Sequence, residues 1–545
     1  MARRPGPGRA PAWALLALPL AALVAAPLLA VLAAAAVPSG AAWRHIAGTT
    51  LPEMLANSAL LALGVGAIAA SIGTLAAWLV TACRFPGRRV LEVALLLPMA
   101  MPAYVCGYAY TWLLDVAGPV QTALRAATGL RWGGYWFPEI RSLPGAAMML
   151  GLVLYPYVYL LCRNAFQQQS LGLIEAARTL GQSLTGCFFR LALPMARPAI
   201  AGGVALALME TLADFGTVQH FGVRTFTTGL YEAWFGLGDR GAASQLAACL
   251  MGLVALLLAF EHLSRGGRRF HPTTARQQGL RPVPLRGWWA AAALIACALP
   301  VALGFLVPAG TLLVLMLQVG DPLAPDRFLP FARNSLLLAG LAALLAVALA
   351  AFLAWAARLH PGGPQRAALR VAGLGYAIPG SVIAVGTLVP LGLFDNALDG
   401  WMRARFGLST GLLLSGGIAA LVFAYLVRFL AVALSAVEAG LARLRPSLRE
   451  AARILGTGPA GAVLRVELPL ARGSLLTAGL LVFVDTMKEL PATLIIRPFD
   501  FDTLAVRVHN LAADERLAEA STAALLIVAA GLLPVLALTR ALRKA

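Results

Sequence analysis

Long apolar stretches recur about twelve times along the chain, and they restrict its fold more than any other feature. A helix needs about 20 apolar residues to cross the ~30 Å of hydrocarbon in a bilayer. The chain is 60% hydrophobic and 12% charged, which leaves too few polar side chains to cover a water-soluble protein of 545 residues. Because the stretches do not alternate as barrel strands do, the sequence predicts an all-α, polytopic membrane protein of about 12 transmembrane helices. The predicted spans lie near residues 12–37, 56–82, 90–114, 145–162, 198–218, 243–262, 288–317, 333–357, 367–393, 410–434, 472–495 and 519–539.

The basic residues predict the orientation of these spans. If the N-terminus is cytoplasmic and the chain crosses twelve times, 29 of the 43 Lys and Arg residues fall on the inner side, 13 on the outer side and Lys488 within a span. An inner excess of positive charge is expected of a membrane protein, so the formal net charge of +19 does not indicate nucleic-acid binding. We therefore expect both termini in the cytoplasm, and the Arg-rich and Ala-rich composition favours the inner membrane of a bacterium.

The chain also contains an internal repeat. Residues 175–181 read EAARTLG and residues 450–456 read EAARILG, at an offset of 275. The same offset relates the Leu-Pro pairs at 193–194 and 468–469, and an offset of 277 relates the Asn-Ser pairs at 57–58 and 334–335. Each repeat holds six spans, an even number, so the two halves enter the membrane from the same side and are parallel. We predict two six-helix domains, residues 1–265 and 288–545, joined by a basic cytoplasmic linker at 266–287.

One polar loop in each half has the same pattern of residues. It lies between the fourth and fifth spans, at about 163–197 in the first half and 434–472 in the second. Each loop reads Glu-Ala-Ala, three residues, Gly, nine residues, an aliphatic residue, one residue and Leu-Pro. The small alanines favour a helix that can approach a partner closely, Gly181 and Gly456 suit the end of that helix, and the Pro suits the start of the fifth span. The pattern predicts a short helix–turn–helix on the cytoplasmic face.

This pattern resembles the EAA loop in the permease subunits of binding-protein-dependent ABC importers, and its double occurrence extends the resemblance over nearly the whole chain. In that family the loop forms a helix that docks in a groove of the ATPase subunit. The resemblance implies two fused permease domains, two copies of a cytoplasmic ABC ATPase subunit and a periplasmic substrate-binding protein. An ordinary interfacial helix pair, copied by gene duplication, is the alternative interpretation. By residue, the resemblance assigns ATPase docking to Glu175, Ala176, Ala177 and Gly181, and to Glu450, Ala451, Ala452 and Gly456.

The sequence carries no motif for binding or hydrolysing ATP. Its two lysines are Lys488 and Lys544, and neither follows the glycines of a phosphate-binding loop. It has no HExxH or GxSxG motif, and its six cysteines are scattered singly without a metal-binding spacing. We therefore expect a transport subunit that is not an enzyme, with no cofactor of its own, ATP bound by the partner subunit, and no assigned metal ligands.

Charged residues in the predicted fifth spans form two clusters at equivalent positions. A spacing of four puts Glu210 and Asp214 on one helix face, as it does Asp485 and Glu489, and Lys488 could pair with Asp485. A charged side chain within a membrane costs ~2.5–3.5 kcal/mol on insertion scales, so each needs a role. The clusters either line a translocation pathway between the halves, where acidic groups suit a cationic cargo, or pair with helix ends or arginines and hold the halves together.

The cargo is assigned by resemblance alone. The segments after the fifth spans, 210–247 and 488–521, look most like those of fused permeases for ferric iron, while other fused permeases serve thiamine or phosphonates. We expect ferric iron, with thiamine or a phosphonate as the alternative. An ion-coupled secondary transporter can also have twelve helices in two parallel halves, but the loop pattern between the fourth and fifth spans favours the ATP-driven class.

Overall fold

The computed structural model describes residues 16–37, 40–168, 177–265, 282–319, 325–359 and 362–544. Within these ranges, 11 helices are long and apolar enough to cross a membrane, or up to 12 if one bent helix pair counts as a span. The prediction of an all-α polytopic membrane protein is confirmed.

The bounds of the elements follow the repeat. In the first half they are α2 Ala17–Ala35, α3 Gly40–Thr49, α4 Leu51–Ala82, β1 Cys83–Arg84, α5 Arg88–Ala94, η1 Leu97–Ala100, α6 Ala103–Leu114, α7 Pro119–Thr128, α8 Leu143–Gln168, α10 Leu184–Cys187, η2 Phe188–Ala192, α11 Leu193–Ala213, α12 Gly216–His220, α13 Phe226–Tyr231, η3 Glu232–Gly236 and α14 Arg240–Arg265. In the second half they are β2 Val283–Pro284, α15 Trp288–Val301, η4 Ala302–Leu306, α16 Val307–Gln318, α17 Pro325–Leu359, α18 Gly363–Ala372, η5 Gly375–Ala377, α19 Gly380–Phe406, α20 Ile418–Ala442, α21 Pro446–Ile454, α22 Pro459–Ala462, η6 Val463–Glu467, α23 Leu468–Met487, α24 Pro491–Ile496, α25 Leu504–Ala513 and α26 Leu517–Lys544.

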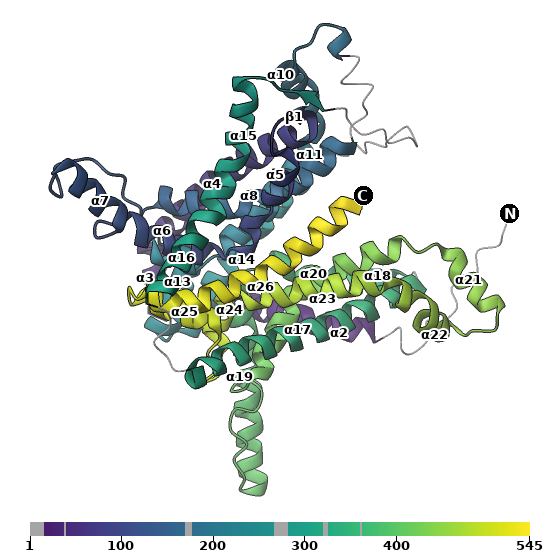
Figure 1. The fold of residues 1–545 in the computed structure, drawn as a ribbon. Helices are drawn as coiled ribbons and strands as arrows, with labels where there is room; N and C mark the ends of the chain where they lie inside the picture. The colour runs from purple at the N-terminus through teal and green to yellow at the C-terminus, as the bar shows by residue number, and fades with distance from the viewer. Residues whose placement is uncertain are drawn as a thin grey trace.

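The helices form two arms that meet at one end and diverge at the other (Figure 1). The second, fourth and fifth spans of each half pack together, as α4, α8 and α11 in the first arm and as α17, α20 and α23 in the second. The short helix α10 lies at the free end of the first arm, and α21 and α22 lie at the free end of the second. The two predicted loops are therefore at the separated ends of the arms.

The two halves of the sequence exchange helices between the arms. The apolar core of the first arm includes residues of α16 and α26 from the second half, and the core of the second arm includes α2 and α14 from the first half. Helix α2, for example, packs against α18 and α19. Each arm is thus completed by the first and last spans of the other sequence half.

The third predicted span of each half is broken rather than continuous. Residues 88–100 and 103–128 are bent by 92° relative to each other, and η5 separates α18 from α19. Both breaks precede a proline, Pro102 or Pro379, whose backbone is extended at the cap of the next helix. A residue before proline is forced out of the helical region, so the chain turns there although its hydropathy is unbroken. The continuous spans predicted at 90–114 and 367–393 were therefore wrong, since each is divided by this break.

The fifth spans begin 14 and 12 residues earlier than predicted, in the first and second half respectively. They run continuously over Leu184–Ala213 and Ala460–Met487, so Leu-Pro lies inside the span and not at its start. A π-turn, η2 or η6, immediately precedes each Leu-Pro. Proline lacks an N–H and its ring clashes with the carbonyl four residues earlier; a π-turn widens the helix at that point, so the helix continues.

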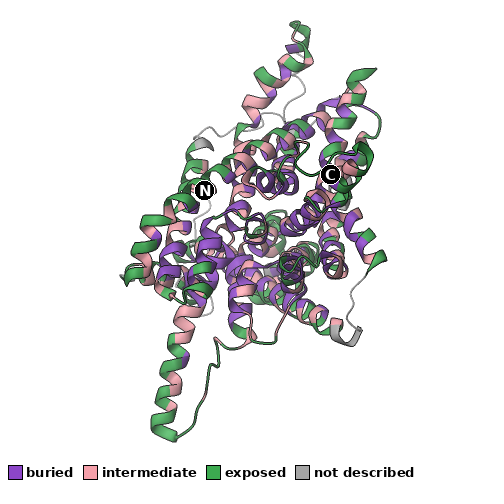
Figure 2. Cartoon of the chain, turned by 90° about the vertical axis from the view of Figure 1, so that its left-hand side faces the viewer, coloured by how far each residue is buried: buried purple, intermediate pink, exposed green. Residues whose placement is uncertain are grey.

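Burial follows the arrangement of the arms. Buried residues gather in the middle of the molecule and exposed residues cover the outward helix surfaces (Figure 2). Large apolar side chains are exposed on those surfaces, including Leu63, Leu256 and Leu344, as expected where lipid is the solvent. Most of the predicted linker, residues 266–281, lies outside the described residues; its end forms β2, which pairs in parallel with β1 beside the loop end of α4.

Candidate functional site

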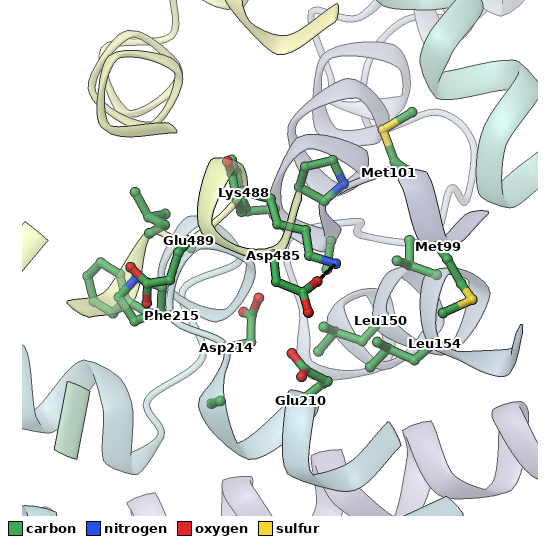
Figure 3. Close-up of a pocket in the computed structure, with 18 of the residues that line it drawn as sticks. Met99, Met101, Leu150, Leu154, Glu210, Asp214, Phe215, Asp485, Lys488 and Glu489 are labelled. Atoms are coloured by element: carbon green, nitrogen blue, oxygen red, sulfur yellow. Dashed lines mark ion pairs between the residues drawn. The ribbon is translucent and has the colours of Figure 1, made fainter. Parts of the chain in front are cut away.

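A cavity of about 100 Å³, the central cavity, lies where the two arms meet, and both sequence halves line it (Figure 3). All five charged residues singled out in the sequence contribute to its lining, together with an arginine that the sequence analysis did not assign to it. These residues are Glu210, Asp214, Arg428, Asp485, Lys488 and Glu489. The structure therefore brings together residues that are up to 279 positions apart.

Two of the acids do not lie on the helix face predicted for them. Helix α11 ends at Ala213 and α23 at Met487, so Asp214 and Glu489 sit in the turn after each fifth span. Asp214 accepts hydrogen bonds from the backbone of Thr217 and Val218 at the start of α12, at 3.0 and 3.1 Å. Glu489 does the same at the start of α24.

Helix N-termini leave several N–H groups without partners, and the helix dipole favours a negative charge there. The backbone N–H groups of Ala492 and Thr493 donate to Glu489 at 2.9 and 3.0 Å. The interpretation in which these acids pair with helix ends is thus the one that the geometry supports for Asp214 and Glu489.

Arg428 falls within the predicted span 410–434, yet it was counted among the 29 basic residues of the inner side, and this was wrong. It lies in the middle of α20, is 8% exposed, and its Nη1 donates to Glu489 Oε1 at 3.0 Å. Its Nε has no hydrogen-bond partner in the described part of the chain. The sequence does contain a signal for this role, because Arg428 is a single arginine ten residues inside an apolar stretch. A charged side chain at such a depth requires an acidic partner within the membrane.

The remaining charges differ in their partners. The predicted pair of Lys488 and Asp485 is confirmed, with 2.9 Å between Nζ and Oδ1 (Figure 3). Glu210 makes no hydrogen bond or ion pair with the residues that the structure describes, and it lines the cavity beside this pair. Glu210 thus has neither an ion pair nor a hydrogen bond with the described residues, whereas Asp214, which also lacks an ion pair, caps α12.

Two further cavities lie on either side of the central one. A cavity of about 530 Å³ shares Met99, Tyr157, Tyr376, Asp485 and Lys488 with the central cavity and continues among mainly apolar side chains of the diverging arms. A cavity of about 200 Å³ lies on the side opposite the loops, which we call the outer side, and is lined by Tyr108, His220, Arg141 and Glu515 among others.

The outer side is closed by contacts between the halves, which we call the outer seam. Tyr108 Oη and His509 Nδ1 are 2.7 Å apart, and the Arg141 guanidinium lies 2.6 Å from Glu515 and 3.0 Å from Asp115. Tyr104 lies one helical turn from Tyr108 and lines the central cavity, with 5.7 Å between the ring centroids. Burial lowers the pKa of His509 to about 4, so this histidine is neutral at pH 7.

The turn in each predicted loop has the same geometry in both halves. Gly181 and Gly456 each have φ of +83°, a left-handed conformation that ends a helix and that other residues adopt only at a cost. Ala177 and Ala452 are buried beneath the loop, whereas Leu180 and Leu455, at equivalent positions, are 83% and 82% exposed. Two identical turns thus present one leucine each to the surroundings.

The other predicted loop residues are only partly described. Glu450 and Ala451 lie in α21 with exposed side chains, while Glu175 and Ala176 lie outside the described residues. Among the described residues, no three His, Cys, Asp or Glu side chains are grouped so that they could hold a metal ion.

Comparison with known proteins agrees with the repeat. The family model described as binding-protein-dependent transport system inner membrane component matches the chain twice, at residues 62–263 and 346–545. The Fe(3+)-transport system permease protein FbpB 2 of Haemophilus influenzae is 26% identical over 506 residues, 90% of each chain. The molybdenum transport system permease protein ModB of Escherichia coli is 29% identical over 223 residues, 39% of this chain and 94% of its own. The sulfate transport system permease protein CysT of Salmonella typhimurium is 31% identical over 172 residues, 31% of this chain and 59% of its own.

The two matches of the family model fall one in each repeat, and a relative of this family aligns with both repeats in one polypeptide. Relatives with a single permease unit align with less than half of the chain. The chain is therefore a transport subunit rather than an enzyme, and it belongs to the family of inner membrane components of binding-protein-dependent transport systems, with two permease units fused in one multi-pass membrane protein.

Proposed function

We propose that this permease imports ferric iron that is delivered by a periplasmic binding protein. The observation that carries the proposal is the charge of the central cavity, which is lined by four carboxylates and two cations. Both cations, Lys488 and Arg428, are already paired with acids. The carboxylate of Glu210 is left to meet a positively charged cargo.

The comparisons support iron over an oxyanion in one respect. The relative that aligns with 90% of the chain is named for Fe(3+) transport, whereas the relatives named for molybdenum and sulfate transport align with a single unit. An oxyanion would also meet an excess of negative charge in the cavity. A single free carboxylate suits transit, because a site along a transport pathway must release the ion as well as bind it.

The driving force comes from partners. We propose that two copies of a cytoplasmic ABC ATPase bind ATP and dock on the EAA loops, through Glu175, Ala176, Ala177 and Gly181 and through Glu450, Ala451, Ala452 and Gly456. The exposed leucines Leu180 and Leu455 would then enter the ATPase surface, which accounts for apolar side chains that are more than 80% exposed. This chain itself needs no bound cofactor.

The two arms suggest how the cycle proceeds. With both termini in the cytoplasm, as the basic residues favour, the arms of this structure diverge towards the cytoplasm and the outer seam is closed (Figure 1). Closure of the two ATPase copies on ATP would draw the EAA loops together and open the outer seam to the loaded binding protein. Hydrolysis would return the transporter to the conformation seen here.

The test is uptake into proteoliposomes that contain this chain and its candidate ATPase. Binding proteins loaded with ferric iron, thiamine, molybdate or sulfate are added outside, with or without ATP inside. ATP-dependent uptake of iron alone supports the proposal. ATP-dependent uptake of another cargo refutes the iron assignment but supports the ATP-driven mechanism. Uptake driven by an ion gradient without the ATPase refutes both the cargo and the mechanism.

A further inference from the structure

A buried carboxylate in the second half, Glu467, lies outside the central cavity and joins four helices near the second EAA loop. Its side chain is 2% exposed and sits in the π-turn η6 that precedes α23. Trp355 Nε1 of α17 donates to Glu467 Oε2 at 2.6 Å, and Arg449 Nε of α21 donates to Oε1 at 3.1 Å. Arg358, also of α17, lies 3.8 Å from the same oxygen.

The two arginines that contact Glu467 also donate hydrogen bonds to backbone carbonyls of neighbouring helices. Arg358 donates to the carbonyls of Leu441 and Leu444 at the end of α20, the latter at 2.7 Å. Arg449 donates to the carbonyl of Arg358 at 3.4 Å. One carboxylate thus holds the end of α17, the end of α20, the helix of the second EAA loop and the start of α23 in one arrangement.

This connection places the loop next to a rigid element that reaches the central cavity. Arg449 immediately precedes Glu450, the first residue of the EAA pattern. From Glu467, a continuous helix leads to Asp485 in the central cavity, 18 residues later and about 27 Å away at 1.5 Å per residue. One continuous helix thus joins the neighbourhood of the loop at one end to the cavity at the other.

The first half does not have the same connection. The position equivalent to Glu467 is Ala192, and the position equivalent to Arg449 is an isoleucine, residue 174. The tryptophan is present in both halves, because Trp78 corresponds to Trp355 at the offset of 277. Its ring packs against Phe166 and Phe188, and its indole N–H has no hydrogen bond to the described residues.

We propose that Glu467 is a positioning residue that fixes the second EAA loop rigidly to α23, so that movement of the ATPase is transmitted to the central cavity chiefly through the second half. The inference rests on the proposed docking of the ATPase at the EAA loops. At the equivalent place in the first half, the described contacts of Trp78 are with aromatic rings, and such contacts are less directional than buried, charge-assisted hydrogen bonds. The two ATPase copies would then drive two mechanically different halves.

The experiment compares matched tryptophan variants in the complete transporter in proteoliposomes. Trp355→Phe removes the donor to Glu467 and keeps an aromatic ring, whereas Trp78→Phe makes the same change where the indole has no hydrogen bond to the described residues. Cargo imported per ATP hydrolysed is measured alongside the amount of ATPase that co-purifies. We expect Trp355→Phe and Glu467→Gln to lower the cargo-to-ATP ratio about five-fold or more, within the usual range of coupling between sites, with ATPase binding unchanged.

A double variant serves as a control for misfolding caused by an unpaired buried charge. Glu467→Ala combined with Arg449→Ile gives the second half the residues that the first half carries and leaves no acid unpaired at this place. It should insert normally and also lower the ratio. Equal ratios for Trp355→Phe and Trp78→Phe, or a wild-type ratio in the double variant, would overturn the inference. A wild-type complex that binds no ATPase or shows no ATP-dependent uptake would instead overturn the proposed function.

Discussion

The charge pair between Arg428 and Glu489 gives the sharpest test of how the central cavity is held. Glu489→Gln keeps the shape of the side chain and an oxygen that can accept from α24, but it removes the charge opposite Arg428. The two side chains are 10% and 1% exposed, so water cannot replace the lost partner. Leaving one member of a buried pair unpaired costs about 3–5 kcal/mol.

The repeat supplies a matched control for this substitution. Asp214 occupies the equivalent position in the first half and caps α12, but it makes no ion pair with the described residues. Asparagine caps helices about as well as aspartate, so Asp214→Asn should cost less than about 1 kcal/mol. The double variant Arg428→Met with Glu489→Gln removes both charges and should recover most of the stability that Glu489→Gln loses.

The measurement is unfolding of the four purified proteins in one mild detergent, followed by tryptophan fluorescence against denaturant. We expect Glu489→Gln to be clearly less stable than Asp214→Asn, with the double variant close to the wild type. If Glu489→Gln and Asp214→Asn prove equally mild, the ion pair does not hold the cavity and Glu489 acts only as a helix cap. If the double variant is as unstable as Glu489→Gln, the loss arises from packing and not from an unpaired charge.

Four further outcomes are expected. Glu210→Gln should slow iron uptake several-fold while ATPase co-purification stays at the wild-type level; unchanged uptake would remove Glu210 from the pathway. Gly181→Ala and Gly456→Ala should each strain the loop by about 1–2 kcal/mol, because φ is +83° at both positions, and reduce ATPase co-purification to a similar degree; an effect at one position alone would contradict equivalent docking. Tyr108→Phe removes a hydrogen bond worth about 0.5–1.5 kcal/mol and should increase labelling of cysteines placed in the outer cavity, whereas unchanged labelling would exclude Tyr108 from the seam. Since burial holds the pKa of His509 near 4, below its ordinary 6.5, the closed seam should be fully stable above pH 6.5 and lose stability as the pH falls from there towards 4; labelling that is independent of pH in this range would contradict the assignment.

Much of the architecture can be predicted from the sequence because it depends on properties of single segments. Long apolar stretches become spans whatever their neighbours are, since backbone groups in lipid must be satisfied within the helix. Asp485 and Lys488 are three residues apart at the end of one span, and the helix ends at Gly181 and Gly456 depend on local backbone freedom. These features were predicted correctly, and the repeat extended them to both halves.

The breaks after the fifth spans show where local reasoning fails. A spacing of four places Glu210 and Asp214 on one face only if the helix continues, and α11 ends at Ala213. Hydropathy does not reveal such an end, because the segment that follows is also apolar. The chain turns there because Asp214 satisfies the first N–H groups of α12, which is a contact of the folded structure.

Only the tertiary structure decided which helices belong together and which charges meet. The exchange of α2, α14, α16 and α26 between the arms follows from packing between segments hundreds of residues apart. The apolar surface of a single helix contains almost no information about which distant helix it will pack against. Arg428 and Glu489 are 61 residues apart, and Tyr108 and His509 are 401 apart. The sequence by itself determined that this chain is a doubled polytopic membrane protein, because hydropathy and spacing are local, and the resemblance of its two loops to the EAA pattern predicted a permease. The fold decided how its cavity is built, because Arg428 and Glu489 can meet only when helices far apart in the sequence pack together.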